Sequence, residues 1–466
     1  MLGYSEGFLG NRHLNIERRV DGTPNLSGFG NLLYHQKGGL PIISPSSRGG
    51  FWPPCVRRMD GLMKIFFSVG EPSGDLHGSN LIQELKRHDP DIECVGFGGP
   101  RMQKAGCHLL VDLTQFAVMF FVRVLLNLHK FFGFARQAEK YFKQHDVDAV
   151  VLIDYPGFNW AVAKRARRHG IPVYYYGVPQ LWAWAPWRIR KMRKNVTYAL
   201  CKLPFEEKWY RDRGCDAKYV GHPFFDELVA HQSDQSFIEE LQQQPTPLVT
   251  ILPGSRTQEV ETQLPWFLKA VSLIREQIPD ARFAIAAFKE SQAEFASTLV
   301  EESGLDIDVY TGRTPELMQA ADCCMACSGS VSLELMYHQK PTVILYHMSK
   351  LLYRYARVMV NIRYITLVNL IASAKPFEPL TVPWSQDHPD CEDIPMPEYP
   401  TCTDKSEVVA EHVIQWLGDH RRYNESVSQL ATLAEMYGHP GASQRAAVFI
   451  LESLTGKSLT TAKSAA

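Results

Sequence analysis

Short apolar runs alternate with longer segments of helical periodicity along most of this chain, beginning at Met63. The first run, Ile65–Val69, ends at Gly70, and a polar loop and a helical pattern follow it. Near-continuous apolar strands with helices between them are typical of a parallel sheet that is buried on both faces. The strands predicted in this first half are 64–70, 92–99, 149–155, 172–178, 198–203 and 217–221.

The alternation stops near Glu227, and a polar stretch with a predicted linker at 243–247 follows. The pattern then restarts, which predicts a second α/β sheet of the same kind. Its expected strands are 248–256, 281–288, 307–312, 323–330 and 342–347. Two Rossmann-like, doubly wound domains that face each other leave a cleft at the carboxyl ends of their strands, where ligands bind in such sheets.

Domain boundaries follow from these two patterns. We expect a first domain at 63–240 and a second at 241–455. Helical patterns at 405–418 and 423–453 are expected to close the second domain. The final residues, 456–466, are predicted to be a loose tail.

Residues 1–62 differ from the rest of the chain. They are rich in Gly, Pro, Ser and Asn, show no sustained periodicity and lack the apolar core of a signal peptide. A segment of this composition cannot bury enough apolar surface to offset its ordering entropy, so we predict a disordered extension. Translation starting at Met59 or Met63 is also compatible with this pattern.

The bulk composition excludes several protein classes. The 466 residues are 45% hydrophobic and 21% charged, with a formal net charge of −1, so no global field steers the chain to nucleic acid. Ten scattered cysteines, several of them in apolar runs, indicate a reduced, cytoplasmic protein. Cys324 and Cys327 form a C-x-x-C motif, but no second cysteine pair accompanies it. Burial in a strand is therefore a simpler interpretation of this motif than metal or redox chemistry.

The longest apolar stretch, Phe116–Phe134, is interrupted by Arg123, Asn127, His129 and Lys130. A membrane-spanning helix needs about 20 predominantly apolar residues, so we predict none. The polar residues recur at roughly helical spacing. The stretch therefore suits either an amphipathic helix at a membrane surface or a core helix of the α/β domain.

The sequence LPGSR, at Leu252–Arg256, comes directly after a predicted strand and before a helical pattern. Gly254 allows a ligand to approach the backbone closely, and Ser255 begins the turn into the helix, whose first N–H groups attract anions. Arg256 adds a bidentate phosphate partner. These features suit a diphosphate bound without a metal, although an ordinary turn with a solvated arginine fits the same letters.

A similar turn follows the strand that ends at Cys327. Ser328, Gly329 and Ser330 can cap the next helix, and Glu334 lies one turn into it, where it can accept hydrogen bonds from ribose hydroxyls. The alternative for Glu334 is a capping or solvated helix residue. No G-x-G-x-x-G fingerprint opens the first strand, which argues against a nicotinamide dinucleotide.

In the first domain, Asp154 stands at the carboxyl end of the predicted strand 149–155. A charge at that point is costly unless it is paired or used in chemistry, so Asp154 is a candidate catalytic group, with a helix cap as the alternative. Two basic runs, 164–170 and 187–194, suit either solvated helix faces or contact with an anionic surface.

These motifs occur together in one order. They are GEPSGDLHG, GFGGPRM, IDYPGFN, WAW, LPFE, VGHP, LPGSR and SGSVSLE. This combination resembles lipid-A-disaccharide synthase, a family of inverting glycosyltransferases with the two-domain GT-B fold. The resemblance implies transfer of a diacylated glucosamine from UDP to 2,3-diacylglucosamine 1-phosphate, giving a β-1,6-linked disaccharide. It also implies a peripheral protein on the cytoplasmic face of the inner membrane.

The resemblance assigns roles to individual residues. Functional positions of the family correspond to Glu71, Asp154, Arg256 and Asn369. Asp154 and Glu71 are the expected catalytic residues. Asp154 is expected to be the general base, with Glu71 and Asp75 as the alternatives, and the loop from Glu71 to Asp75 is implied to hold acceptor or donor sugar groups near the reacting centre. The reaction needs no metal or other cofactor. The substrates UDP-diacylglucosamine and an acylated glucosamine phosphate are the implied partners, and a homodimer is left open.

The chain also departs from the family's pattern. Phe120 follows Met119, and Arg123 stands where glutamate is expected. The Pro- and Asp-rich segment 375–404, which we expect to be irregular, does not match the short helix-leading segment of the family. Two other functions therefore stay open. One is a related GT-B enzyme or an epimerase that acts on another UDP-sugar, and the other is a catalytically silent lipid- or nucleotide-binding protein.

Overall fold

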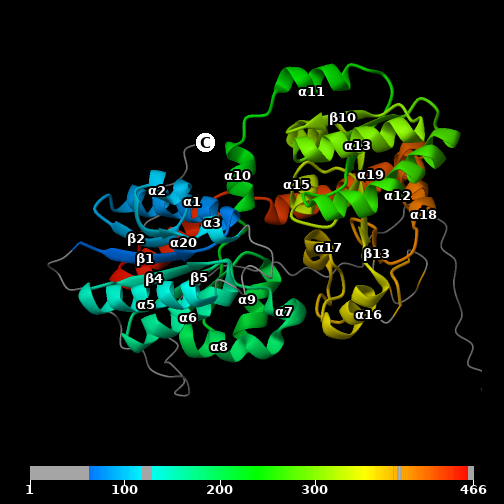
Figure 1. Cartoon of the computed structure of the whole chain (residues 1–466). Helices are drawn as coiled ribbons and strands as arrows, with labels where there is room; N and C mark the ends of the chain where they lie inside the picture. Colours follow the sequence, from blue (N-terminus) through cyan, green and yellow to red (C-terminus); the bar gives the residue numbers. More distant parts are fainter. Residues whose placement is uncertain are drawn as a thin grey trace, which may run out of the picture. The chain divides into compact units, whose positions relative to one another are not determined.

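A computed structural model of the chain describes residues 62–117, 128–380, 382–385, 388, 391 and 393–459, and these residues form two parallel β-sheets flanked by helices (Figure 1). The first sheet has the strand order β3-β2-β1-β4-β5-β6-β7. All of its paired strands run parallel. Its strands are β1 Lys64–Val69, β2 Glu93–Gly98, β3 Cys107–Asp112, β4 Ala149–Ile153, β5 Val173–Tyr176, β6 Tyr198–Cys201 and β7 Ala217–Tyr219.

Helices connect these strands and cover the sheet. They begin and end where the apolar periodicity does, and several start at a proline, whose fixed φ suits the first helical turn. They are α1 Pro72–His88, α2 Pro100–Lys104, α3 Thr114–Ala117, α5 Leu128–Gln144, α6 Pro156–Arg168, α7 Leu181–Trp184, α8 Ile189–Asn195, α9 Pro204–Arg211 and α10 Phe224–Ala230, with a short 3₁₀ helix η1 at Pro186–Arg188.

The second sheet has the order β10-β9-β8-β11-β12-β13, again with parallel pairs throughout. Its strands are β8 Leu248–Leu252, β9 Arg282–Ala287, β10 Asp308–Thr311, β11 Cys323–Cys327, β12 Thr342–His347 and β13 Glu398–Thr401. Its helices are α11 Gln235–Gln242, α12 Thr257–Gln277, α13 Glu290–Ser303, α14 Thr314–Ala320, α15 Val331–Tyr337, α16 Lys350–Met359, α17 Leu367–Ala372, α18 Ser406–Gly418 and α19 His420–Tyr437.

Both sheets reverse their strand order at one place, between β1 and β4 in the first and between β8 and β11 in the second. Loops after the strands on either side of such a reversal diverge, which opens a ligand site at the carboxyl ends. The predicted fold class, two Rossmann-like doubly wound domains of the GT-B type, is confirmed.

Two strands, β3 and β13, were not predicted, and both are partly exposed strands at the edges of their sheets. In β3, Cys107–Asp112, the pairing with β2 shifts register between Gly96 and Phe97, and most of the side chains are only half-buried. In β13, Glu398–Thr401, a proline occupies an edge position, where no ladder donor is needed. The segment 375–404, expected to be irregular, therefore contributes the last strand of the second sheet.

The C-terminal helices differ from the prediction in number and in place. The expected helix at 423–453 is two helices, α19 and α20 Ala442–Thr455, and Gly441 between them has a positive φ of 93°. The buried face of α20, which includes Ala446 and Ile450, joins the core of the first sheet beside α1 (Figure 1). The last helix therefore belongs with the first sheet, whereas the sequence pattern assigned it to the second domain.

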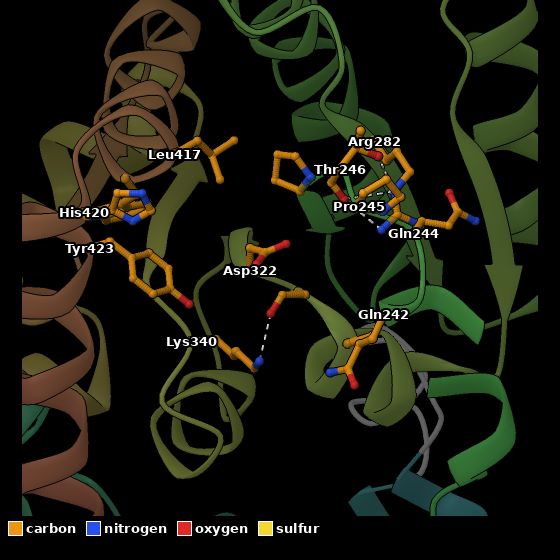
Figure 2. A pocket seen from close by; sticks show the side chains of 14 residues that line it. Gln242, Gln244, Pro245, Thr246, Arg282, Asp322, Lys340, Leu417, His420 and Tyr423 are labelled. Atoms are coloured by element: carbon orange, nitrogen blue, oxygen red, sulfur yellow. Dashed lines mark hydrogen bonds between the residues drawn. The ribbon is translucent and has the colours of Figure 1, made fainter. Parts of the chain in front are cut away.

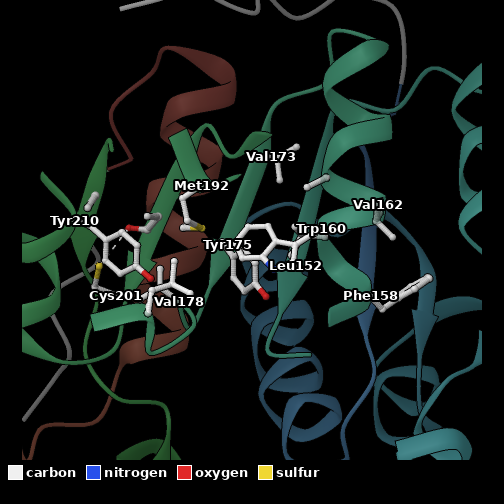
Figure 3. Packing of buried hydrophobic residues seen from close by; sticks show 14 of the residues in the cluster. Leu152, Phe158, Trp160, Val162, Val173, Tyr175, Val178, Met192, Cys201 and Tyr210 are labelled. Carbon is white, nitrogen blue, oxygen red and sulfur yellow. Dashed lines mark hydrogen bonds between the residues drawn. The ribbon is translucent and has the colours of Figure 1, made fainter. Parts of the chain in front are cut away.

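Large aromatic side chains fill the core on one face of the first sheet. Trp160 of α6 lies against Tyr175 of β5, with ring centroids 5.7 Å apart, and Leu152 of β4 is buried beside them (Figure 3). The ring of Tyr175 is fully buried, and its hydroxyl donates a hydrogen bond to the backbone carbonyl of Asp154, 2.7 Å away. The core thus fixes the position of the loop that follows β4.

The two ends of the apolar stretch Phe116–Phe134 belong to this same core. The ring centroids of Phe116 and Phe131 lie 6.3 Å apart, and those of Phe131 and Phe158 lie 5.8 Å apart. Residues 118–127 lie outside the described residues, as do 1–61 and 460–466. Among the residues that the structure describes, no helix has the length and apolar character needed to cross a membrane.

Candidate active site

A pocket of about 500 Å³ opens at the carboxyl ends of the central strands of the second sheet. Its wall includes Leu252, the last residue of β8, and Cys327, the last residue of β11. Seven residues predicted from the LPGSR and SGSVSLE motifs line it together, namely Gly254, Ser255, Arg256, Ser328, Gly329, Ser330 and Glu334. The structure thus brings two motifs more than 70 residues apart in the sequence into one wall.

The turn after β8 depends on glycine. Gly254 has a φ of 125°, which side-chain-bearing residues rarely adopt, and a Cβ there would lie 2.7 Å from the Cβ of Glu259. The next turn begins α12, where a carboxylate oxygen of Glu259 accepts a hydrogen bond from the backbone N–H of Arg256. The loop is therefore held tightly against the start of α12.

Arg256 is the most exposed charged group of this wall. Its side chain is 79% exposed, and its guanidinium lies 2.7 Å from a carboxylate oxygen of Glu259. An exposed ion pair of this kind contributes little to stability, so the guanidinium can exchange Glu259 for a ligand oxyanion at low cost. The geometry leaves Arg256 able to reach a phosphate in the pocket.

Glu334 lies in the same wall with an unused acceptor. Its side chain is 8% exposed, and its Oε1 atom is buried without a hydrogen-bond partner among the described residues. Burial, with a smaller contribution from Glu316, raises its pKa to about 7. An unpaired buried oxygen is costly, and a hydroxyl group entering the pocket would satisfy it.

A second pocket in this domain, of about 430 Å³, opens at the opposite end of the strands (Figure 2). It is lined by residues that precede strands, including Pro247 before β8 and Asp322 before β11, and by Lys340 and Tyr423. Lys340 already donates to the carbonyl of Ala321, 2.8 Å away. Because ligands of such sheets bind at the carboxyl ends, the pocket that contains LPGSR is the candidate substrate site.

In the first domain, the loop after β4 holds Asp154 in a strained conformation. Asp154 and Tyr155 have φ angles of 47° and 42°, in the left-handed region. The amide of Asn159 donates to the Asp154 carbonyl at 2.8 Å, alongside the Tyr175 hydroxyl. Strain of this kind persists only where the surroundings enforce it, and it concentrates at functional sites.

The neighbouring loop after β1 fits closely against this strained turn. A Cβ on Gly70 would lie 2.5 Å from the Tyr155 ring, so only glycine allows the two loops to meet. Glu71 follows as the N-cap residue of α1, and its side chain makes no capping hydrogen bond. The fold therefore brings the carboxylates of Glu71 and Asp154 to adjacent loops at one edge of the sheet.

The carboxylates of Glu71 and Asp154 interact electrostatically with each other and with nearby cations. A carboxylate oxygen of Asp154 lies 3.2 Å from the ammonium of Lys202, which follows β6. The pKa of Glu71 is raised by burial and by the charge of Asp154. The positive charges of Lys202 and of Arg256, which belongs to the second domain, oppose this shift without cancelling it. Burial alone would lower the pKa of Lys202, but the carboxylates of Asp154 and Glu206 outweigh it, so the pKa of Lys202 is raised.

Asp75 has a different environment from the other predicted carboxylates. It is 3% exposed, and its two oxygens accept hydrogen bonds from the backbone N–H groups of Gly99, Arg101 and Met102 at 2.9–3.1 Å. These are the free donors at the start of α2. Asp75 thus holds the loop after β2 against α1, and its contact with substrate stays a prediction.

Asn369 is likewise fully buried. Its amide nitrogen donates to the Met396 carbonyl at 2.7 Å and to a carboxylate oxygen of Glu398 at 2.9 Å, and its amide oxygen accepts from the Met396 N–H. Every polar atom of the side chain is therefore engaged in joining α17 to β13. A direct substrate contact for Asn369 also stays a prediction.

Three residues near these loops were not predicted. Lys202 pairs with Asp154, Phe288 lines the pocket with its ring 62% exposed, and Gln292 donates to the Ser255 carbonyl at 3.1 Å. Phe288 directly follows β9, so an exposed aromatic residue at a strand's carboxyl end was the available signal. The role of Gln292 depends on a contact 37 residues away, which no local pattern reveals.

The cysteine pair of β11 is buried in the second core. Burial raises the pKa of Cys324 and Cys327 to about 12, so both thiols stay protonated near neutral pH. The Cys327 sulfur accepts a hydrogen bond from Gln263 of α12, 3.1 Å away. These cysteines act as packing residues, in agreement with the simpler reading of the C-x-x-C spacing.

Comparison with known proteins adds the decisive observation. A model of the lipid-A-disaccharide synthetase family matches residues 65–414, which include both sheets and every motif described above. The chain belongs to this family. It is similar to the lipid-A-disaccharide synthase of Geobacter sulfurreducens, with 30% identity over 84% of this chain and 97% of the relative. The Coxiella burnetii synthase is also 30% identical, over 83% of this chain and 97% of the relative.

Solved structures share the architecture at much lower identity. A structure described as a UDP-N-acetylglucosamine 2-epimerase from Listeria monocytogenes aligns with a TM-score of 0.56 and 12% identity, over 85% of this chain and 98% of that one. A UDP complex of S. aureus MnaA aligns with a TM-score of 0.56 and 11% identity, over 85% of this chain and 99% of that one. At these identities the likeness concerns the fold.

Membership in the lipid-A-disaccharide synthetase family makes the chain a glycosyltransferase of lipid A biosynthesis. The resemblance stated from the motifs is thereby confirmed, as are the enzyme class and the pathway.

Proposed function

We propose that the chain transfers 2,3-diacylglucosamine from UDP to the 6-hydroxyl of 2,3-diacylglucosamine 1-phosphate, with inversion at the anomeric carbon. The observation that carries this proposal is the pocket of the second domain, in which both predicted motifs share one wall with a phosphate-reaching arginine and an unpaired buried carboxylate oxygen. The two motifs together match a nucleoside diphosphate better than either motif does alone.

UDP would lie in that pocket. Its diphosphate would receive hydrogen bonds from the backbone at Gly254 and Ser255 and from the guanidinium of Arg256, which stabilise the charge that develops on the leaving group. A ribose hydroxyl would donate to the unpaired oxygen of Glu334. The exposed ring of Phe288 offers an apolar face for the base.

Asp154 would act as the general base. The acceptor oxygen attacks the anomeric carbon, the bond from that carbon to the UDP oxygen breaks, and the hydroxyl proton passes to the Asp154 carboxylate. Attack from the face opposite to UDP gives the β-linked product. The strained turn and the ion pair with Lys202 support this assignment because they hold the carboxylate at the carboxyl end of β4.

Lys202 would serve as a positioning residue. Its ammonium restrains one carboxylate oxygen of Asp154 and leaves the other available to the acceptor hydroxyl. Glu71, whose raised pKa reflects burial and the nearby Asp154, would hold a sugar hydroxyl rather than compete as the base.

The enzyme would work at the cytoplasmic surface of the inner membrane. Both proposed substrates carry acyl chains and so reside at a lipid surface, where a peripheral protein can reach them. The basic runs 164–170 and 187–194 are compatible with anionic lipids.

The test is analysis of the product. Incubation of UDP-2,3-diacylglucosamine with 2,3-diacylglucosamine 1-phosphate should give a disaccharide 1-phosphate whose new linkage is β-1,6 by NMR spectroscopy. An epimerase, the function printed for the Listeria structure of similar fold, would change the donor's configuration without any acceptor. A donor that isomerises alone, or an α-linked product, would overturn the proposal.

A further inference from the structure

Helix α16, Lys350–Met359, carries four large apolar side chains that are half or more exposed, and none of its residues is buried. Leu351 and Val358 are 79% and 80% exposed, more than any other large apolar side chain that the structure describes. Leu352 and Tyr355 are 50% and 60% exposed. Leaving this much apolar surface in water is unfavourable, so such a patch usually marks a contact surface.

The exposed apolar residues share one face of the helix. At 100° per residue, Leu351, Leu352, Tyr355 and Val358 fall within a single sector of about 120°. Lys350 and Arg354 lie on its flank, in the neighbouring sector. The helix therefore presents an apolar stripe bordered by positive charge, the pattern of helices that lie in a membrane interface.

A third side of α16 faces a cavity. Tyr353 and Ala356 line a cavity of about 420 Å³ together with Val360, Leu380 and Trp384. The segment after the helix is anchored separately, because the backbone N–H of Asn361 donates to the Ala183 carbonyl, 2.7 Å away. Tyr353 and Ala356 are half-buried on this side, whereas the described residues leave the apolar stripe exposed.

The charged residues in and around α16 are all positive. From Met348 to Lys375 the sequence contains five lysines and arginines and no aspartate or glutamate. Within the described part of the chain, neither Lys350 nor Arg354 forms an ion pair. Two unpaired cations beside an apolar stripe favour an anionic partner.

We propose that α16 is the element that docks this enzyme onto an anionic lipid surface, with its apolar stripe among the acyl chains and Lys350 and Arg354 at the headgroups. The inference rests on the proposed function, which requires lipid substrates, and it names the surface that reaches them. A second copy of the chain is a poorer occupant, because contact through the same face would gather like charges in one interface.

The experiment measures partitioning of the whole protein onto vesicles by co-sedimentation. Vesicles of phosphatidylglycerol with phosphatidylcholine are compared with vesicles of phosphatidylcholine alone. The wild type should bind the anionic vesicles more tightly, and added salt should weaken that binding. The double variant K350Q/R354Q should lose about 25-fold in partitioning, at about fivefold per basic group.

The apolar stripe is tested separately with L351Q/V358Q. This variant should lose at least about tenfold in partitioning onto both vesicle types, because two exposed side chains no longer enter the acyl region. The control is K104Q/K143Q, which changes the charge by the same amount at two exposed lysines of α2 and α5 that lie outside the basic runs 164–170 and 187–194. This control should keep most of the wild-type binding.

Calorimetric binding of UDP to each variant separates docking from folding and from catalysis. UDP affinity should be unchanged in both α16 variants, since neither touches the pocket of the second domain. The proposal is overturned if the α16 variants partition like the wild type, or if sedimentation velocity shows that L351Q/V358Q instead dissociates an oligomer. Failure of the enzyme to form disaccharide would overturn the proposed function while leaving vesicle binding to be judged by itself.

Discussion

At the scale of single residues, the candidate site contains groups that the fold holds in energetically unfavourable states. Asp154 and Tyr155 adopt left-handed φ angles, and Asn159 and Tyr175 fix the carbonyl between them. Glu334 keeps a buried oxygen unpaired. Such features lower stability in the free protein. In the proposed reaction, a ribose hydroxyl would supply the partner that the Glu334 oxygen lacks among the described residues.

Arg256 is the first residue to test. We expect R256A to weaken UDP binding about 10- to 150-fold, since a hydrogen bond to a charged group contributes about 1.5–3 kcal/mol. Isothermal titration calorimetry checks this, with K269A as the control because Lys269 lies on the same helix, α12, and pairs with Asp404 instead. Unchanged UDP affinity in R256A would remove the arginine from the phosphate site.

Glu334 gives a prediction with a pH signature. A carboxyl group whose pKa rises on folding, here from 4.5 to about 7, contributes its full stability below pH 4.5 and loses it as the pH rises through 7. The loss is of the order of 3 kcal/mol. We therefore expect E334Q to be more stable than the wild type at pH 8 and similar to it near pH 4.5.

Thermal unfolding at both pH values tests this difference. The same variant should bind UDP more weakly at pH 8, because a neutral amide accepts the ribose hydroxyl less strongly than a carboxylate does. An equal stability difference at the two pH values would show that the ionisation of Glu334 plays no part.

Much of the candidate site was predictable at this scale, and the limits are physical. Gly254, Arg256 and Glu334 could be predicted because a ligand site at a strand's carboxyl end needs those residue types at fixed local spacing. Lys202 could not, because it lies 48 residues from Asp154 and meets it only after β4 and β6 take their places in the sheet. Asp75 and Asn369 carry polar groups that suit a ligand, yet backbone groups and, for Asn369, the Glu398 carboxylate already occupy their hydrogen bonds.

At the scale of elements, the candidate site lies on loops that follow strands, and helices hold those loops in place. The strands were predictable wherever both of their faces are buried, because the sequence then becomes continuously apolar. All four edge strands are partly exposed. Of these, β7 and β10 were predicted and β3 and β13 were not. Their pairing depends on neighbours that no local pattern records.

The turn at Gly254 provides the test at this scale. We expect G254A to destabilise the protein by about 1–3 kcal/mol, because alanine at a φ of 125° is strained and its Cβ meets Glu259. UDP binding should fall as the loop shifts. G157A is the matched control, since Gly157 lies in α6 with open space around it and should be neutral or slightly stabilising. Equal effects of the two substitutions on thermal unfolding would contradict the account.

At the scale of the whole molecule, the chain returns to its first sheet at the end. Helix α20 packs beside α1, and its first N–H groups at Ala442 and Ser443 bond to the carboxylate of Asp226 on α10, at 3.1 and 2.9 Å. The helix was predicted from its periodicity, but its destination was not, because an amphipathic helix fits the face of either sheet.

Asp226 therefore links distant parts of the sequence. We expect D226A to cost about 1–2 kcal/mol, as the loss of a helix cap does, and to raise amide hydrogen exchange in both α20 and α1. D419A, which removes the corresponding cap of α19, should affect exchange in α19 without reaching α1. Exchange in α1 that stays unchanged in D226A would show that α20 docks independently of this cap.

In the proposed reaction the two domains act together, since the second domain would hold UDP and Asp154 of the first would take the acceptor proton. The most direct measurement is the rate of UDP release from UDP-2,3-diacylglucosamine, with and without acceptor, in the wild type and in D154N. We predict release only when acceptor is present, and a loss of about 10²–10⁴-fold in D154N with UDP affinity nearly unchanged. Release without acceptor, or a D154N rate above about a third of the wild-type rate, would contradict the account.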